Sequence, residues 1–311
     1  MGLTASTGLD ALRERVLAYA ALVRLPNVFT APPDVLAGAA VVVVVGGVGV
    51  ELAEVIGLAL ASASVYAGGT TLNDYVDADV DAVERPERPI PAGLVSRPKA
   101  FALGVVLLGC GVAAALVAGG VRSGVVAVTL AALVVVYDGV AKGTPLGWAV
   151  MGLTRGVNVI LGTTIGGGLL TGGWWPAAVP LCVTGYVAAV TWMADDEAHG
   201  TDRTAVAAVA GVGAVLAAVP PAITVVAGSE VFLTTVATGL GIGFVVIVGR
   251  PLVAVYRMPT PSRVGPAVGR SILGLAVVQA ATATVAGLAW TATALGCFVA
   301  ARWLSGAFDV S

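Results

Sequence analysis

Charged side chains are scarce in this sequence, and their scarcity limits what kind of protein it can be. Only 11% of its 311 residues are Asp, Glu, Lys or Arg, whereas 58% are hydrophobic. Soluble globular domains are ordinarily about 45–50% apolar and about 25% charged. The composition therefore excludes an ordinary soluble domain and predicts a polytopic membrane protein.

Histidine and cysteine are also rare. The chain has one histidine, His199, and a single histidine in a polar segment is more often a solvated loop residue than a catalytic base. Three cysteines, Cys110, Cys182 and Cys297, stand singly in apolar stretches, without the short spacings of metal sites and with one left over from any disulfide pairing. We interpret them as small hydrophobic side chains.

The N-terminal segment lacks the compact apolar core and cleavage site of a secretory signal. It carries Arg13, Glu14, Arg15 and Arg24 among broken apolar patches. We expect residues 10–30 to form an amphipathic helix that leads into the membrane.

Long apolar runs, by contrast, are abundant. Nine of them reach the length of a membrane-spanning helix, and the small residues within them suit close packing between helices in a membrane. These runs are residues 31–49, 54–72, 101–119, 123–141, 147–169, 177–194, 205–227, 231–249 and 271–299. The sequence therefore predicts an all-α fold, a bundle of nine transmembrane helices that forms a single membrane domain over residues 1–311.

Basic residues are distributed unevenly between the two sides of this predicted bundle. Only Arg122 and Arg302 fall on the side opposite to the N-terminus, and Arg155 falls inside a span. The other Lys and Arg residues share the N-terminal side: Arg13, Arg15, Arg24, Arg85, Arg88, Arg97, Lys99, Lys142, Arg203, Arg250, Arg257, Arg263 and Arg270. Because cytoplasmic loops are enriched in Lys and Arg, we expect a multi-pass protein of the cell membrane with a cytoplasmic N-terminus. The polar connections after the second, fourth and sixth spans then lie on the cytoplasmic face and can converge on one site.

The densest charge in the chain directly follows the second apolar run. The segment NDYVDADVD at residues 73–81 holds four carboxylates. If it continues the preceding helix, Asn73, Asp77 and Asp81 lie on one face, and Asp74 lies a turn from Asp77. Carboxylates stacked so closely repel each other, and hard divalent cations such as Mg²⁺, with phosphate oxygens completing the shell, suit them. The alternative is a solvated acidic loop neutralised by nearby arginines.

The longer segment NDYVDADVDAVERPERPIPAG, residues 73–93, resembles the signature of the UbiA superfamily of intramembrane prenyltransferases. That signature reads N-D-x-x-D-x-x-x-D, followed by R-P-x-R-P-[LI]-P-x-G. Nine helices and a second acidic motif after the sixth are further features of the family. The resemblance therefore extends over nearly the whole chain.

This resemblance implies roles for the polar residues of the segment. Four of them are expected to hold Mg²⁺ on a prenyl diphosphate, namely Asn73, Asp74, Asp77 and Asp81. Asn73 also contacts the substrate in this interpretation, and Asp74 and Asp77 belong to the catalytic centre. Arg85 and Arg88 are expected to face the diphosphate or brace the loop. Metal and guanidinium charges of this kind neutralise a leaving diphosphate as the carbon–oxygen bond breaks.

A second acidic cluster, DDEAHGTDR at residues 195–203, lies between the sixth and seventh spans and resembles the family's second motif. Its spacing departs from the patterns D-x-x-x-D and E-D-x-E-G-D-R that many members show. We expect metal ligands among Asp195, Asp196 and Asp202, favouring Asp195 and Asp202, and we expect Arg203 to contact substrate. Glu197 is a further alternative ligand, and the remaining interpretation is a solvated turn that links two helices.

Two further pairs of polar residues stand between the acidic clusters. Tyr137 and Lys142 resemble the family's Tyr-x-x-x-Lys with one extra residue, which implies that Tyr137 contacts substrate and Lys142 the diphosphate. Alternatively, Asp138 and Lys142, at i and i+4, form a helix-surface pair. Arg155 and Asn158 share one face of a span, where ionisable residues are functional candidates by default. A permanent cation there can bind diphosphate or an acceptor that bears a carboxylate or carbonyl group.

Polar residues also stand at the entry to the first span. Residues 24–27, RLPN, resemble the R-x-P-N with which family members often open. Asn27 either lines the acceptor pocket or caps the helix that begins after Pro26. Asp34, inside the span, must find a partner or stay protonated.

Together these features predict a Mg²⁺-dependent enzyme that transfers an isoprenyl group from a prenyl diphosphate to a lipophilic or small-molecule acceptor. Its surroundings are membrane lipids, and no nucleic-acid partner is expected. A terpene cyclase on the same scaffold is the alternative, although an aromatic content of 6% gives it no particular support. A transporter is a third possibility, which the absence of an inverted repeat with paired broken helices and the two acidic loops on one face argue against.

Overall fold

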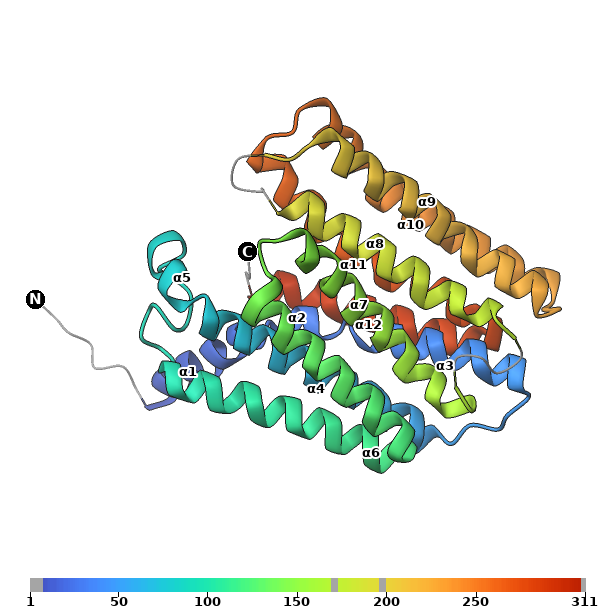
Figure 1. Ribbon diagram of the computed structural model, residues 1–311, viewed down its shortest axis with the longest axis horizontal. Helices are drawn as coiled ribbons and strands as arrows, with labels where there is room; N and C mark the ends of the chain where they lie inside the picture. The colour runs from blue at the N-terminus through green and yellow to red at the C-terminus, as the bar shows by residue number, and fades with distance from the viewer. Residues whose placement is uncertain (1–7, 169–172, 196–199, 309–311) are drawn as a thin grey trace, which may run out of the picture.

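The computed structural model describes residues 8–168, 173–195 and 200–308. Within these ranges the chain is helical and contains no strand, which confirms the all-α fold. The helices run back and forth between two ends of an elongated bundle (Figure 1). We term the end that carries the short helix α5 (Ala78–Glu84) the motif end, and the opposite end the far end.

The other elements fall into three groups along the chain. The N-terminal part contains α1 (Gly8–Leu22), α2 (Leu25–Val28), α3 (Pro32–Gly46) and α4 (Leu52–Val76). The middle part contains α6 (Arg97–Val136), the π-helical turn η1 (Tyr137–Ala141), α7 (Pro145–Thr163), η2 (Thr164–Gly166), η3 (Trp175–Ala177) and α8 (Ala178–Ala194). The C-terminal part contains α9 (Arg203–Val226), α10 (Val231–Arg257), α11 (Pro261–Ala283), η4 (Thr284–Ala286) and α12 (Leu288–Phe308).

Seven helical segments within the described ranges are long and apolar enough to cross a membrane, so the expected count of nine is not confirmed. One of them, Arg97–Ala141, contains two of the predicted spans, because α6 bends at Gly119 and Gly120. Gly120 has φ 69° and ψ −164°, a conformation that only glycine adopts readily. Helices α7 and α12, of 19 and 21 residues, are long enough to cross a membrane but are less apolar than these seven segments. The chain is thus an integral membrane protein.

Two expected boundaries differ from the structure. The predicted lead-in helix over residues 10–30 is divided into α1 and α2, because Arg24 between them adopts a left-handed conformation with φ 49°. The predicted last span, residues 271–299, is two helices, because the chain turns through η4 and Gly287. Helix α12 therefore returns toward the motif end, where both ends of the described chain lie (Figure 1).

Close backbone contacts fix α3 against α7. A Cβ atom added to Gly38 would overlap the carbonyl oxygen of Val159, and one added to Gly162 would overlap that of Val35. Small residues allow helix backbones in a membrane to approach this closely. The contact places the polar residues at the start of α3 directly against those in the middle of α7.

Candidate active site

A cavity of about 360 Å³ opens between α4, the end of α6 with η1, and α7. Eight of the residues that the sequence singled out line it: Asn73, Asp77, Arg85, Arg88, Tyr137, Lys142, Arg155 and Asn158. Arg24, Tyr66, Thr70 and Asp138 also line it, although the sequence analysis gave them no role in the site. The polar segments after the second and fourth predicted spans therefore do converge, as expected.

The first acidic motif divides between the cavity and its supporting wall. Helix α4 ends at Val76 and α5 begins at Ala78, with Asp77 at the joint. Asn73 and Asp77 line the cavity, as their i, i+4 spacing predicts. Asp81 does not share this face. It is 4% exposed and accepts a hydrogen bond from Arg88 at 2.7 Å, so the expectation of three residues on one face is wrong at its third position.

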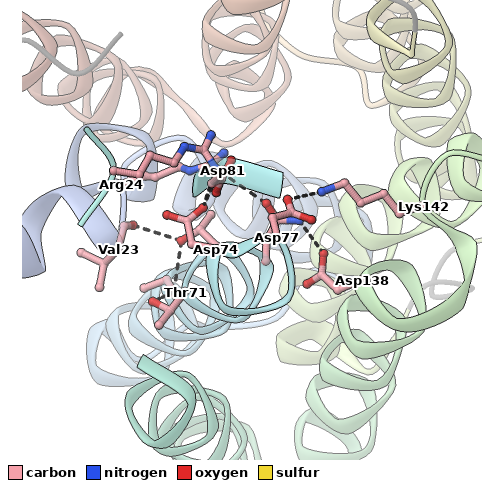
Figure 2. Close-up of polar contacts among 12 residues, drawn as sticks. Val23, Arg24, Thr71, Asp74, Asp77, Asp81, Asp138 and Lys142 are labelled. Carbon is pink, nitrogen blue, oxygen red and sulfur yellow. Dashed lines mark hydrogen bonds and ion pairs between the residues drawn. The ribbon is translucent and has the colours of Figure 1, made fainter. Parts of the chain in front are cut away.

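Asp74 is held by two arginines rather than placed on the cavity wall. Its Oδ1 accepts hydrogen bonds from Arg24 at 2.9 Å and from Arg88 at 3.2 Å, as Figure 2 shows for the Arg24 side. Asp74 is 5% exposed, and a buried carboxylate requires such pairing. The arginines thus neutralise Asp74 and Asp81, as the alternative interpretation of the acidic run anticipated for the motif as a whole.

Arg24 is the residue in this group that the sequence analysis overlooked. It is the one non-glycine residue with positive φ in the described ranges. A non-glycine residue in this region is uncommon and is strained unless its surroundings hold it there. The ion pair with Asp74 holds the Arg24 side chain in place and so stabilises this backbone conformation. The available signal was the basic residue that opens the segment RLPN at residues 24–27, two residues before Pro26, but the substrate-binding role was predicted for Asn27.

The connection after the fourth predicted span contributes Asp138, which lies in η1, and Lys142, which directly follows η1. Lys142 forms an ion pair with Asp77, and Asn73 donates a hydrogen bond to Asp138 at 2.8 Å (Figure 2). The suggested helix-surface pair between Asp138 and Lys142 is therefore not formed. The π-helical turn changes the helical phase, and both side chains face α4 instead.

The inner part of the cavity is built by α3 and α7. Arg155 donates hydrogen bonds to Asp34 at 2.9 Å and to the backbone oxygen of Thr30 at 3.0 Å. Asn158 donates to the same Asp34 oxygen at 3.0 Å. Asp34 is fully buried, so it finds the partners that its position demanded. The guanidinium of Arg155 also lies over the ring of Tyr66, 5.5 Å from its centroid.

The second acidic motif is only partly described. Asp195 is exposed at the end of α8, while Asp196, Glu197 and His199 lie outside the described residues. Asp202 is the N-cap of α9, where its carboxylate accepts a hydrogen bond from the backbone N–H of Thr204. This bond lowers the pKa of the Asp202 carboxyl below its ordinary value. A capping role for Asp202 is therefore visible, whereas a metal-binding role stays a prediction.

Three other predicted residues have different settings. Arg203 lies with its guanidinium 5.9 Å from the ring centroid of Tyr256 and is not among the residues that line the cavity. Asn27 is exposed, and α3 begins after Ala31 without a side-chain cap, so neither suggested role of Asn27 is seen. Arg85 lines the cavity and, within the described ranges, has no carboxylate within ion-pair distance.

The donor atoms at the motif end fit a hard divalent cation. Within the described ranges no three Asp, Glu, His or Cys side chains are gathered as a preformed cluster. Two carboxylates and an amide, from Asp77, Asp138 and Asn73, nevertheless face one cavity. Such oxygen ligands are those that Mg²⁺ takes together with the phosphate oxygens of a substrate. Cationic Arg85, Arg88 and Lys142 line the same end and suit the phosphates.

Comparison with known proteins identifies the family. Residues 35–258 match the model of the UbiA prenyltransferase family. The chain therefore belongs to this family. A similar curated protein is the digeranylgeranylglyceryl phosphate synthase of Methanopyrus kandleri, which is 40% identical over 131 residues. That match covers 42% of this chain and 45% of the relative, so the chain spans less than half the length of this relative.

Solved structures share the fold. An apo structure of a UbiA homologue from Aeropyrum pernix K1 has a TM-score of 0.61 at 20% identity, covering 82% of this chain and 96% of that one. A UbiA homologue from Archaeoglobus fulgidus bound to GPP and Mg²⁺ has a TM-score of 0.60 at 16% identity, covering 85% and 99%. These likenesses support the helical architecture.

Proposed function

We propose that this chain transfers an isoprenyl group from a prenyl diphosphate to a hydroxyl group of a glycerophosphate-type lipid within the membrane, in a Mg²⁺-dependent reaction. The observation that carries this proposal is the cavity, whose motif end combines oxygen donors with cations. The name of the Methanopyrus relative supports the acceptor class, and the GPP and Mg²⁺ bound to the Archaeoglobus homologue support the donor and the ion.

The residues of the motif end have different roles in binding the prenyl diphosphate. Asn73, Asp77 and Asp138 would hold Mg²⁺, which when bound neutralises charge on the leaving diphosphate. Arg85 and Lys142 bind diphosphate oxygens from the same wall. The bond between C1 of the donor and its oxygen breaks, and the electron pair leaves with the diphosphate. The acceptor oxygen bonds to C1, and its hydroxyl proton is released.

Asp74 and Asp81 act in this proposal by positioning cations rather than by binding metal. Each is buried and accepts a hydrogen bond from Arg88, and Asp74 also accepts one from Arg24. Both arginines line the cavity. Fixed guanidinium groups stabilise the charge that develops on the diphosphate without reorganising during the reaction. Asp195 and Asp202 remain proposed ligands from the second motif, together with Asp196.

We further propose that the motif end faces the cytoplasm. Because α12 returns to this end, Arg302 joins the other basic residues there instead of lying opposite to them. Arg122, which stands next to Gly168 at the far end, is then the single basic residue opposite the motif end within the described ranges. Such an imbalance favours a cytoplasmic motif end and N-terminus.

The test uses purified protein in nanodiscs with Mg²⁺ and radiolabelled geranyl, farnesyl or geranylgeranyl diphosphate. A glyceryl phosphate monoether, or a membrane extract, is added as acceptor. We expect label to move to the acceptor only with Mg²⁺ present, and Asp77→Ala to abolish the transfer. Asp79→Ala is the matched control, because Asp79 belongs to the same acidic run but is exposed and pairs with Arg97 outside the cavity.

Other outcomes point to other activities. Hydrocarbon or terpene alcohol formed without any acceptor, and lost in Asp77→Ala, would replace the transferase with a cyclase. Transfer to an extract component but not to the glyceryl phosphate ether would retain the transferase and reject the acceptor class. Absence of Mg²⁺-dependent diphosphate release with every donor would reject both enzymes.

A further inference from the structure

The inner end of the cavity carries no net charge, although it contains an arginine. Asp34 accepts hydrogen bonds on both of its oxygens, from Arg155 and Asn158 on Oδ2 and from Gln279 at 2.9 Å on Oδ1. Arg155 and Asp34 form a buried ion pair, with 2.9 Å between Nη1 and Oδ2. The charge of Arg155 is therefore balanced by Asp34 within hydrogen-bond distance.

The guanidinium of Arg155 is also occupied by other partners. It donates to the backbone oxygen of Thr30 at 3.0 Å and to the Thr30 hydroxyl at 2.9 Å. The ring of Tyr66 covers it. An anionic ligand at this end would meet a cation that is already paired and would lie close to the Asp34 carboxylate. Like charges in a poorly solvated site repel strongly, so the pocket disfavours a carboxylate or phosphate.

Two buried polar atoms in this pocket lack partners within the described ranges. They are Oδ1 of Asn158 and Oγ of Ser62. Asn158 is 4% exposed and Ser62 is 1% exposed, and both residues line the cavity, from α7 and α4. A buried polar atom without a hydrogen bond is destabilising, so a ligand that satisfies it gains binding free energy.

The position of the pocket separates it from the diphosphate. Tyr66, which covers Arg155, precedes Asn73 by seven residues on α4, and seven helical residues rise about 10 Å. We propose that this inner pocket binds the neutral glycerol ether part of the acceptor, with the acceptor's free O–H donating to Asn158 Oδ1 and its ether oxygen accepting a hydrogen bond from the Ser62 hydroxyl. This inference rests on the proposed transferase function and replaces the expectation that Arg155 binds a carboxylated acceptor.

The test compares two small probes of equal chain length that differ in headgroup. Binding of 1-O-hexylglycerol, a neutral diol, and of hexanoate is measured by titration calorimetry on the full chain in detergent. We expect the diol to bind at least tenfold more tightly than hexanoate. Ser62→Ala should weaken diol binding at least threefold, and Asn158→Leu at least tenfold. Ser305→Ala, in α12 outside the cavity lining, should leave it unchanged.

Stability supplies a second readout that a purely structural role would not produce. Because Ser62 Oγ has no partner, Ser62→Ala should leave the thermal stability unchanged or raise it while diol binding weakens. Asn158 also supports Asp34, so Ser62→Ala decides the question if Asn158→Leu does not fold. Equal or tighter binding of hexanoate, no saturable diol binding, or diol binding unaffected by Ser62→Ala would each overturn the inference.

A parallel titration with geranylgeranyl diphosphate and Mg²⁺ separates this inference from the proposed function. If the wild-type chain binds the donor but not the diol, the inner-pocket assignment fails alone. If it binds the diol but shows no Mg²⁺-dependent donor binding, the transferase proposal fails and the pocket stands as a site for a neutral hydroxyl ligand.

Discussion

The two ends of the cavity both contain buried carboxylates paired with arginines, yet they are built differently. At the motif end the ion pairs are partly open to solvent, since the Arg24 side chain is 31% and the Lys142 side chain 38% exposed. At the inner end the Arg155 side chain is 9% exposed and Asp34 is completely buried. The first arrangement can exchange partners at low cost, whereas the second cannot.

This difference indicates a division of roles. Ion pairs near solvent are individually weak, so Lys142 can leave Asp77 for a diphosphate without unfolding the site. A buried pair that loses one partner leaves an uncompensated charge, which is strongly destabilising. The motif end is therefore suited to binding and releasing charged ligands, and the inner end to holding α3, α7 and α11 in a fixed arrangement.

The substitution expected to have the largest effect is Asp34→Ala, at the inner end. It strands the Arg155 charge inside the bundle and should lower the free energy of unfolding by about 3–5 kcal/mol. The measurement is reversible unfolding in mixed micelles by denaturing detergent. The double variant Asp34→Leu with Arg155→Met, which removes both charges, should recover most of the loss. A loss below about 1 kcal/mol in the single variant would mean that the inner network does not hold the helices.

At the motif end the same kind of change should act on the reaction rather than on folding. Asp77→Ala removes the cavity carboxylate that pairs with Lys142. We expect prenyl transfer to fall at least 100-fold, about 2.7 kcal/mol in the activation barrier, while unfolding changes by less than about 1 kcal/mol. Activity and unfolding are measured on the same preparation. If the variant unfolds as readily as Asp34→Ala, the two ends do not differ in the way described.

A third change tests the helix contact on which the inner end depends. Gly162→Ala introduces a methyl group that would overlap the backbone oxygen of Val35, so α3 and α7 must separate. Overpacking of this kind costs roughly 1–3 kcal/mol, and it should also weaken the hydrogen bonds from Arg155 to Thr30. The control is Gly109→Ala, because a Cβ there meets no atom within 4 Å. Equal stability of the two variants would argue against a glycine-dependent contact.

The sequence predicted the motif end better than the inner end for a physical reason. Four carboxylates within residues 73–81 of a charge-poor chain form a local signal, and helical spacing correctly placed Asn73 and Asp77 on the cavity. The helix joint at Asp77 was not encoded in that spacing, and it turns Asp81 toward Arg88. Local periodicity thus predicts a face only as far as the helix stays regular.

Contacts between distant segments were beyond the reach of this reasoning. The need of Asp34 for a partner was predictable, but its partner Gln279 lies 245 residues away. Asn73 and Asp138 are 65 residues apart, and their contact depends on the π-helical turn that follows α6. The boundary of the last predicted span failed for a related reason, because the turn at residues 284–287 interrupts a continuous apolar run without any charged residue to mark it.

The smallest expected effect belongs to an acidic residue of the same motif that lies outside the cavity. Asp79 is 82% exposed in its ion pair with Arg97, and such surface pairs contribute about 0–1 kcal/mol. Asp79→Ala should therefore leave both transfer activity and unfolding within about twofold and 1 kcal/mol of the wild type, with any difference disappearing at high salt. A large loss of transfer would show that the acidic run acts as a whole. In that case burial and cavity position would not be what distinguishes Asp77 from its neighbours.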